Sequence, residues 1–358
     1  SLTFDAGTTF SYDTVSTSSY LINMADKSSS LYLNGCSLKC STTGLNLTKG
    51  RLFLDNKILF KNNEIEDLSS LTVTTSVHYG LRAYDVKWSP DNRYLAVGGQ
   101  NNPKDFTVYG WNGSTLEYLT HVNTGSYLMS VDWTSDGKYI VVGGSGINDV
   151  YVYSWDGSSL VQKGALSHGI VYDVKWSPDN KFLAVGSDDG DNDLLIYRWA
   201  GEALTLTTSQ HFGARVNSVS WHPTRNYIAV GGNYSDTDVI LYGFDGSSLN
   251  FIQAEPHGLG AESLEWSSDG NYLVVLGGST GTNGLKIYKF ANNSLEEVTA
   301  ILGSGGKSVK WSTNNKYLAL GGTFGDPDIY IYEFNGNSLQ LATSLDYGNG
   351  ANSVDWDA

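Results

Sequence analysis

Val86-Lys87-Trp88-Ser89-Pro90-Asp91-Asn92 is a stretch that returns along the chain with small changes, and its period decides the fold. Almost every copy has Val or Leu two residues before the tryptophan and Ser, Thr or His directly after it. A period of this length indicates an array of like units that stack to bury their apolar faces. The tryptophans stand 43 to 45 residues apart, at Trp88, Trp133, Trp176, Trp221, Trp266, Trp311 and Trp356.

Each unit is predicted to form four short strands. In the second unit, alternating apolar and polar residues predict strands over 130–133, 139–142, 150–155 and 160–166. Asp-Gly and Asn-Gly pairs between them are typical of hairpin turns. Four such strands cannot cover both of their own faces, so neighbouring units must do so, as in a radial β-propeller.

The repeated residues resemble WD repeats. The resemblance rests on Val-x-Trp-Ser-Pro-Asp, on the apolar strand that follows, and on an Asp six residues before an aromatic residue. It covers residues 66–358, but it lacks the Gly-His pair and the strand-two Ser of the family, and Gly284 replaces Asp in the fifth unit. The resemblance implies a propeller of four-stranded antiparallel blades. The Asp-to-aromatic pairs are Asp105/Trp111, Asp149/Trp155, Asp193/Trp199, Asp238/Phe244 and Asp328/Phe334.

Seven tryptophans predict seven blades, although only six complete units follow them. Segments within residues 46–78 are similar to the three strands that the last unit lacks. We therefore predict an all-β fold with a seven-bladed propeller over residues 46–358. Strands from residues 48–75 would pair with residues 353–356 and close the ring. A truncated seventh blade is the alternative.

Residues 1–45 do not match the repeat and are predicted to form a β-rich N-terminal extension. Their leucine spacing is compatible with coils of a β-solenoid and with a simple outer sheet. Cys36 and Cys40 are too few for a disulfide scaffold. Within one strand they would lie too far apart to bond, whereas a turn between them would permit a disulfide.

The composition narrows the classes of partner. Basic residues number 22 against 37 acidic ones, a net charge of −15, which argues against nucleic acid as a partner. The longest apolar run, residues 272–276, is far shorter than the roughly 20 residues of a membrane span. Only 16% of residues are charged while Ser, Thr, Asn and Gly abound, so we expect a secreted or cell-surface protein.

Alternating carboxylates occur in the loop before the third strand of the third unit, at Asp189, Asp191 and Asp193. Such oxygens can coordinate calcium, so these three residues are a candidate metal site; a solvated turn with one capping Asp is the alternative. Five of the six histidines precede a tryptophan by 8 to 12 residues, one per unit. The resemblance implies that a His there ties one blade to the next. We predict no catalytic residue.

A candidate binding set stands four residues before each tryptophan. These residues share no chemistry from unit to unit, so packing does not dictate them, and they should ring the channel mouth on the face with the variable loops. The prediction is a non-enzymatic scaffold that binds a protein or glycan there. The alternatives are a propeller hydrolase or lactonase with a metal at the channel mouth, and a multivalent lectin. The set is Tyr84, Met129, Tyr172, Asn217, Glu262, Lys307 and Asn352.

The residues directly before the tryptophans carry charges that sum to zero. Read round a closed ring, no two like charges are neighbours. We therefore expect a charge-balanced girdle near the axis. It consists of Lys87, Asp132, Lys175, Ser220, Glu265, Lys310 and Asp355.

Overall fold

A computed structural model of the chain describes residues 71–357 apart from residues 72, 101–102, 147, 234–236, 259, 278–280, 304, 324–326, 347 and 349; within residues 1–70 it describes the backbone of five strands. Contacts divide the chain into two units, Ser1–Glu66 and Asp67–Ala358. Every regular element in the described residues is a β-strand, as the repeat predicts. These residues contain no helix long and apolar enough to span a membrane.

The first unit is built from parallel pairs. Strands β1 (Leu2–Phe4), β3 (Ser30–Leu33) and β5 (Arg51–Leu54) form one sheet, and β2 (Thr9–Ser11) pairs with β4 (Ser37–Lys39). Parallel pairing of successive segments is the pattern of stacked solenoid coils. Strand β5 belongs to the stretch expected to close the ring, yet it pairs with β3. Residues 55–70, Cys36 and Cys40 lie outside the described residues.

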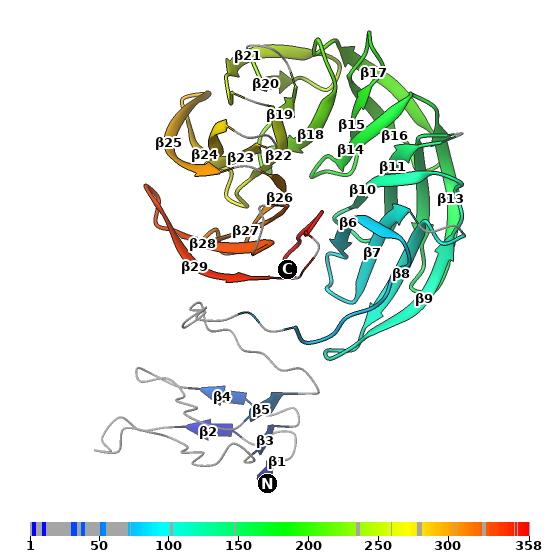
Figure 1. Cartoon of the computed structure of the whole chain (residues 1–358). Helices are drawn as coiled ribbons and strands as arrows, with labels where there is room; N and C mark the ends of the chain where they lie inside the picture. Colours follow the sequence, from blue (N-terminus) through cyan, green and yellow to red (C-terminus); the bar gives the residue numbers. More distant parts are fainter. Residues whose placement is uncertain are drawn as a thin grey trace. The chain divides into compact units, whose positions relative to one another are not determined.

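The second unit is a ring of six four-stranded antiparallel sheets (Figure 1). Within each sheet the strands follow chain order from the axis outward. The blades are β6 (Arg82–Trp88), β7 (Tyr94–Gln100), β8 (Phe106–Trp111) and β9 (Leu116–Val122); β10 (Tyr127–Trp133), β11 (Tyr139–Ser145), β12 (Val150–Trp155) and β13 (Leu160–Leu166); β14 (Ile170–Trp176), β15 (Phe182–Asp188), β16 (Leu194–Trp199) and β17 (Leu204–Gln210); β18 (Val216–Trp221), β19 (Tyr227–Gly232), β20 (Val239–Phe244) and β21 (Leu249–Glu255); β22 (Ala261–Trp266), β23 (Tyr272–Gly277), β24 (Gly281–Ala291) and β25 (Ser294–Gly303); β26 (Gly306–Trp311), β27 (Tyr317–Gly322), β28 (Ile329–Phe334) and β29 (Leu339–Leu345).

The prediction of seven blades is wrong, because the described residues form six. The seventh tryptophan, Trp356, lies in a segment that is no strand of any described sheet. This segment nevertheless takes the seventh inner position, between the sixth blade and the first (Figure 1). Trp356 Nε1 donates to the carbonyl of Lys310 at 3.0 Å, and on the other side Ser353 Oγ donates to Asp85 Oδ1 at 2.6 Å. A tryptophan of the repeat therefore marks an inner position of the ring.

A belt of hydrogen bonds, here called the inner belt, joins all seven inner positions. Three residues before each tryptophan stands an Asp or Ser, whose side-chain oxygen accepts the backbone N–H two residues before the next tryptophan. The seven N···O distances lie between 2.8 and 3.4 Å. The last bond, from Val86 N to Ser353 Oγ, closes the ring. The acceptors are Asp85, Ser130, Asp173, Ser218, Ser263, Ser308 and Ser353.

The apolar core lies between blades. One cluster joins Phe106 and Val108 of the first blade to Val131, Trp133 and Tyr153 of the second, and similar clusters follow round the ring. Each blade thus buries both faces against its neighbours, as four isolated strands cannot.

The turn after each inner strand explains the repeated Asp-Asn and Asp-Gly pairs. In the first blade Ser89 Oγ donates to Asp91 Oδ1 at 2.7 Å and accepts the N–H of Tyr94 at 3.0 Å. Asn92 then adopts φ 57°, and Gly137 adopts φ 68° in the second blade. Left-handed backbone favours Gly and Asn, which is why these residue types recur there.

Anchors between blades are built on the Asp that precedes the third strand. This carboxylate accepts the backbone N–H of the residue 19 positions later, in the loop that leads to the next blade. The distances are 2.9 to 3.0 Å. The resemblance to WD repeats implies a His in this loop; its backbone N–H makes the bond at His168 and His257, while His211 Nδ1 lies 3.0 Å from Asp193 Oδ2. The anchor pairs are Asp105/Thr124, Asp149/His168, Asp193/Phe212 and Asp238/His257.

His257 is 1% exposed, so its imidazole is enclosed between the fourth and fifth blades. Burial, reinforced by the nearby Lys286 ammonium, lowers the pKa of His257 from 6.5 to about 4. In the unfolded chain the ring would protonate near its ordinary value. Between these values the unfolded state binds more protons, so folding stability must fall as the pH drops.

Removing residues 353–358 should lower the melting temperature by roughly 10 °C, because the deletion breaks the inner belt on both sides of the seventh position. Thermal unfolding followed by circular dichroism measures the change. Removing only residues 357–358 is the matched control and should leave the melting temperature unchanged. Equal melting curves for the two truncations would show that the belt does not need its closing bonds.

His257→Leu should flatten the acid side of the stability profile. Wild type should lose about 3 kcal/mol from this group between pH 7 and pH 4, since its pKa is about 4 when folded and 6.5 when unfolded. The free energy of unfolding of the variant should not show this decrease, whatever its value at pH 7. Urea denaturation at several pH values measures it. His78→Gln, at an exposed position, is the control and should follow wild type; a His257→Leu profile parallel to wild type contradicts the prediction.

Candidate functional site

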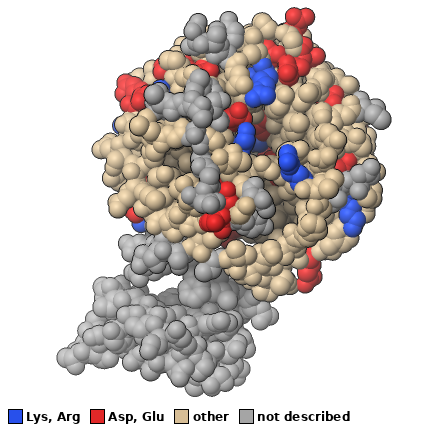
Figure 2. Space-filling model, viewed as in Figure 1, with Lys and Arg blue, Asp and Glu red and all other residues tan. Residues whose placement is uncertain are grey.

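A pocket of about 100 Å³ opens at the axis of the ring, here called the axial pocket. Figure 2 shows acidic and basic side chains gathered around this central hollow. The structure brings all seven residues of the predicted binding set to the wall of this pocket, where inner-belt residues join them. The seven are Tyr84, Met129, Tyr172, Asn217, Glu262, Lys307 and Asn352.

A β-bulge places each of these residues in the six blades. The pairing of β6 with β7 passes from Ala83 to Asp85, which leaves Tyr84 as the extra residue. A bulge takes a side chain out of the regular alternation and re-aims it, and bulges are frequent next to functional sites. The same break falls at Met129, Tyr172, Asn217, Glu262 and Lys307.

Two members of the set have structural partners. Asn217 Nδ2 donates to the carbonyl of Ala261 at 3.0 Å, and Asn352 Nδ2 donates to the carbonyl of Ala83 at 2.9 Å. Each amide thus braces the next inner position. Tyr84, Met129, Tyr172, Glu262 and Lys307 remain as the variable part of the wall, and their role in binding stays a prediction.

Three carboxylates line the axial pocket, and two of them are fully used by the inner belt. Asp173 accepts from Ser130 Oγ at 2.7 Å, from Val219 N at 2.9 Å and from Lys175 Nζ at 2.6 Å. Asp85 is engaged in the same way. Among the described residues Glu262 has two ion contacts, 3.6 Å from Arg215 Nη2 and 3.9 Å from Lys307 Nζ. Both exceed hydrogen-bond length, so the oxygens of Glu262 retain capacity to accept hydrogen bonds.

The floor of the pocket holds two lysines, Lys175 and Lys310. Burial alone would lower the pKa of each, but the carboxylates beside them outweigh it and raise both values. Asp173 does this for Lys175, and Glu265 does it for Lys310. Both amines therefore stay protonated at neutral pH and act as fixed positive charges.

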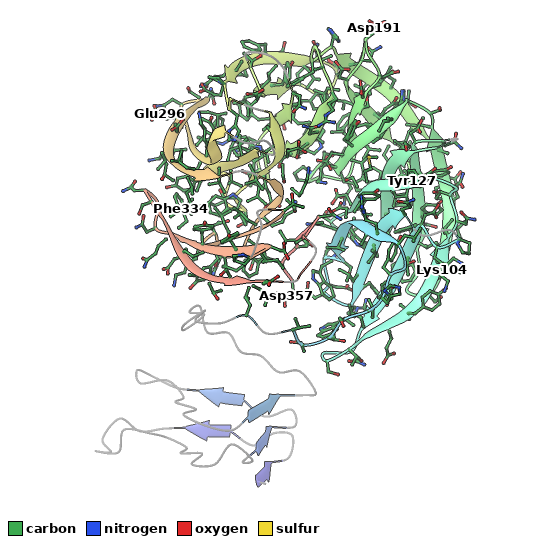
Figure 3. All side chains as sticks on the ribbon, viewed as in Figure 1. Lys104, Tyr127, Asp191, Glu296, Phe334 and Asp357 are labelled. Carbon is green, nitrogen blue, oxygen red and sulfur yellow. The ribbon has the colours of Figure 1, made fainter. Side chains whose placement is uncertain are left out.

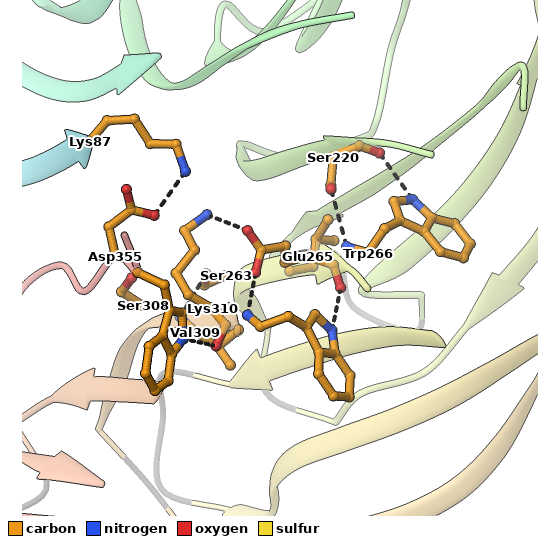
Figure 4. A network of polar contacts seen from close by, with 12 residues as sticks. Lys87, Ser220, Ser263, Glu265, Trp266, Ser308, Val309, Lys310 and Asp355 are labelled. Atoms are coloured by element: carbon orange, nitrogen blue, oxygen red, sulfur yellow. Dashed lines mark hydrogen bonds and ion pairs between the residues drawn. The ribbon is translucent and has the colours of Figure 1, made fainter. Parts of the chain in front are cut away.

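Two ion pairs of the predicted girdle join neighbouring inner positions (Figure 4). Lys87 Nζ lies 2.8 Å from Asp355 Oδ1, and Lys310 Nζ lies 3.0 Å from Glu265 Oε1. Lys175 differs, because it pairs with Asp173 in its own strand. Within this series only Lys175 and Lys310 line the axial pocket. The girdle thus braces the blades.

The candidate calcium residues are not brought together. Asp193 is buried and accepts the N–H of Phe212, which makes it an anchor. Asp191 lies at the outer edge of the ring (Figure 3). In the part of the chain that the structure describes, no three His, Cys, Asp or Glu side chains are grouped to hold a metal ion. Calcium binding by Asp189, Asp191 and Asp193 stays a prediction.

Solved structures with similar folds include several sugar-lactone enzymes by name. The periplasmic gluconolactonase PpgL of Pseudomonas aeruginosa is 19% identical, with a TM-score of 0.65, over 75% of this chain and 86% of that one. A candidate 6-phosphogluconolactonase from Bacteroides uniformis ATCC 8492 is 15% identical, with a TM-score of 0.67, over 76% and 88%. At these identities the likeness establishes the fold. Among curated proteins, none matches this chain.

These comparisons correct the predicted function. A non-enzymatic scaffold that binds a protein or glycan was expected, whereas the similar propellers are named as gluconolactonases and 6-phosphogluconolactonases. The names of these propellers conflict with the expected scaffold without enzyme activity, and they agree with the alternative, a propeller hydrolase or lactonase.

The repeat region also matches a known family. The family described as Eukaryotic translation initiation factor eIF2A matches residues 64–212 and, in a second overlapping alignment, residues 145–301. The match supports the propeller reading of the repeat without singling out WD repeats. Since the two alignments together span residues 64–301 of the 358, the chain belongs to the eIF2A family of β-propellers.

Proposed function

We propose that the chain hydrolyses a small lactone in the axial pocket, with Glu262 as general base. The observation that carries this proposal is the state of Glu262: alone among the three carboxylates that line the pocket, it is not consumed by hydrogen bonds of the inner belt. Arg215 and Lys307 flank it. A carboxylate with free acceptor capacity beside two cations is suited to activating water next to a developing negative charge.

The reaction follows from these groups. Glu262 takes a proton from a water molecule, and the oxygen of that water attacks the lactone carbonyl carbon. The carbonyl oxygen becomes an oxyanion, which the Lys307 ammonium in the pocket wall stabilises, while Arg215 holds Glu262 from behind the wall. The carbon–oxygen ring bond then breaks, and the leaving ring oxygen takes the proton held by Glu262. The product is an open hydroxy acid, which loses its acid proton to water and becomes a carboxylate that the Lys307 ammonium attracts.

The pocket suits a small, polar substrate. Its volume of about 100 Å³ suits a substrate with a single ring. Hydroxyl, amide and charged groups make up most of the wall, which favours a lactone with several hydroxyls over an apolar one. The names of the similar propellers support the same substrate class.

The donor set does not fit a metal at the channel mouth. Asp85 and Asp173 already accept hydrogen bonds from backbone N–H groups and hydroxyls, and Glu262 alone offers a single carboxylate. The mechanism therefore has no step through a metal ion.

Translation initiation, named in the family description, is the second candidate function, favoured by the match over residues 64–301. The net charge of −15 disfavours direct contact with nucleic-acid phosphates, so we assign no residues to it. Export from the cytoplasm remains part of the proposal; the uncharged polar composition and the periplasmic gluconolactonase support it.

Glu262→Gln should lower kcat for lactone hydrolysis at least ~100-fold with little change in KM, because the amide cannot take up the proton. Glucono-δ-lactone and a pH indicator measure the rate after subtraction of spontaneous hydrolysis. Glu333→Gln, on β28, is the matched control; the Glu333 carboxylate is half exposed and lies 3.4 Å from the Lys316 ammonium. Full activity in Glu262→Gln, or none in wild type, would overturn the proposed function.

A further inference from the structure

The anchors do more than fix loops, because the residue that donates the N–H also places its side chain between two blades. Phe212 and His257 are 3% and 1% exposed, so their rings fill the space beside the anchor. The His168 imidazole bonds the Tyr197 hydroxyl there. In these interfaces the chain supplies its own ring to close the gap.

The fifth blade lacks both the anchor Asp and the ring that follows it. Gly284 stands where the other described blades have the anchor Asp, and Gly303 stands 19 residues later, where Phe212 or His257 would be. A Cβ on Gly284 would lie 2.8 Å from the backbone of Gly303, so the two strands meet more closely than a side chain allows.

The missing anchor lengthens the hairpin of this blade. Strands β24 and β25 have 11 and 10 residues, against 6 and 7 in the fourth blade. Without a carboxylate to draw the loop inward, pairing continues to Gly281 and Gly303. Leu302 is carried outward with the strand and is 75% exposed.

A cavity of about 300 Å³ remains between the fifth and sixth blades, here called the fifth-blade pocket. Its apolar wall includes Leu276, Leu285, Ile301 and Leu320. Tyr332 also lines it and is only half buried, whereas its counterparts Tyr153 and Tyr197 are 2% and 3% exposed. Among the residues that the structure describes here, none that lines the pocket is charged.

We propose that the fifth-blade pocket binds a small uncharged aromatic molecule. The occupants of the equivalent positions in this same chain define its chemistry: a phenyl ring at Phe212 and an imidazole at His257. Gly303 has no side chain to offer, so a ring of phenol or indole size can enter from solution. Aliphatic walls and a tyrosine face suit such a ring, while the absence of charge disfavours an ionic ligand. This site is independent of the axial pocket and of the proposed hydrolysis.

Gly303→Phe restores the missing ring and tests the proposal. A Cβ at Gly303 meets no atom within 4 Å, and its backbone is outside the left-handed region, so the substitution introduces no strain there. 4-Iodophenol is the probe, titrated by calorimetry against the full chain. Gly303→Phe should weaken its binding at least tenfold and raise the melting temperature by a few degrees. Phe251→Ala, at a 63% exposed position on β21, is the control and should bind as wild type does.

A wild-type crystal soaked with 4-iodophenol gives a second readout that needs no variant. The anomalous signal of iodine should lie between the fifth and sixth blades, beside Tyr332. Iodine found only elsewhere, a pocket filled by Leu302, or equal binding by wild type and Gly303→Phe would each overturn the proposal.

Discussion

The ring depends on one repeated hydrogen bond, from a backbone N–H of one inner position to an Asp or Ser side chain of the position before it. Side-chain acceptors are needed here because adjacent inner strands belong to different sheets and have no ladder between them. Two positions use Asp in place of Ser, and the second oxygen accepts a further donor: Asp173 takes the Ser130 hydroxyl, and Asp85 takes the Ser353 hydroxyl. Five tryptophan indoles add a second set of bonds between inner positions, such as Trp133 Nε1 to the carbonyl of Lys87 at 3.1 Å.

The inner belt also distinguishes the carboxylates of the axial pocket from one another. Carboxylates inside it are saturated and hold the ring, whereas Glu262, one residue outside it on a bulge, keeps its oxygens free. Structure and chemistry are therefore divided between adjacent residues on one strand. A carboxylate in the axial pocket cannot be judged by its position alone; the donors around it decide its role.

Much of this architecture could be predicted from the sequence, because the tryptophan period and the turn residues directly reflect hydrogen bonds that each blade repeats. The predicted number of blades was wrong, because Trp356 makes the hydrogen bond of an inner position although the described residues supply no further strands for a seventh blade. The wall residues of the axial pocket could be selected because their residue types differ from unit to unit. The bulges that position them could not be predicted, because no particular residue type accompanies them. The exception at Gly284 was visible in the spacing. Its consequence, a longer hairpin and an open pocket, depends on where a missing hydrogen bond lets two strands continue to pair.

The bulges have a consequence for how this protein can diversify. A bulged residue stands outside the ladder of its sheet, and side chains such as Tyr84 and Lys307 stand outside the cores between blades. Substitutions at such surface positions usually change stability by less than about 0.5 kcal/mol. Lining residues of this kind can therefore be exchanged one at a time while the inner belt and the Asn217 and Asn352 amides keep their bonds, so that selection for a new ligand and selection for folding act on different side chains.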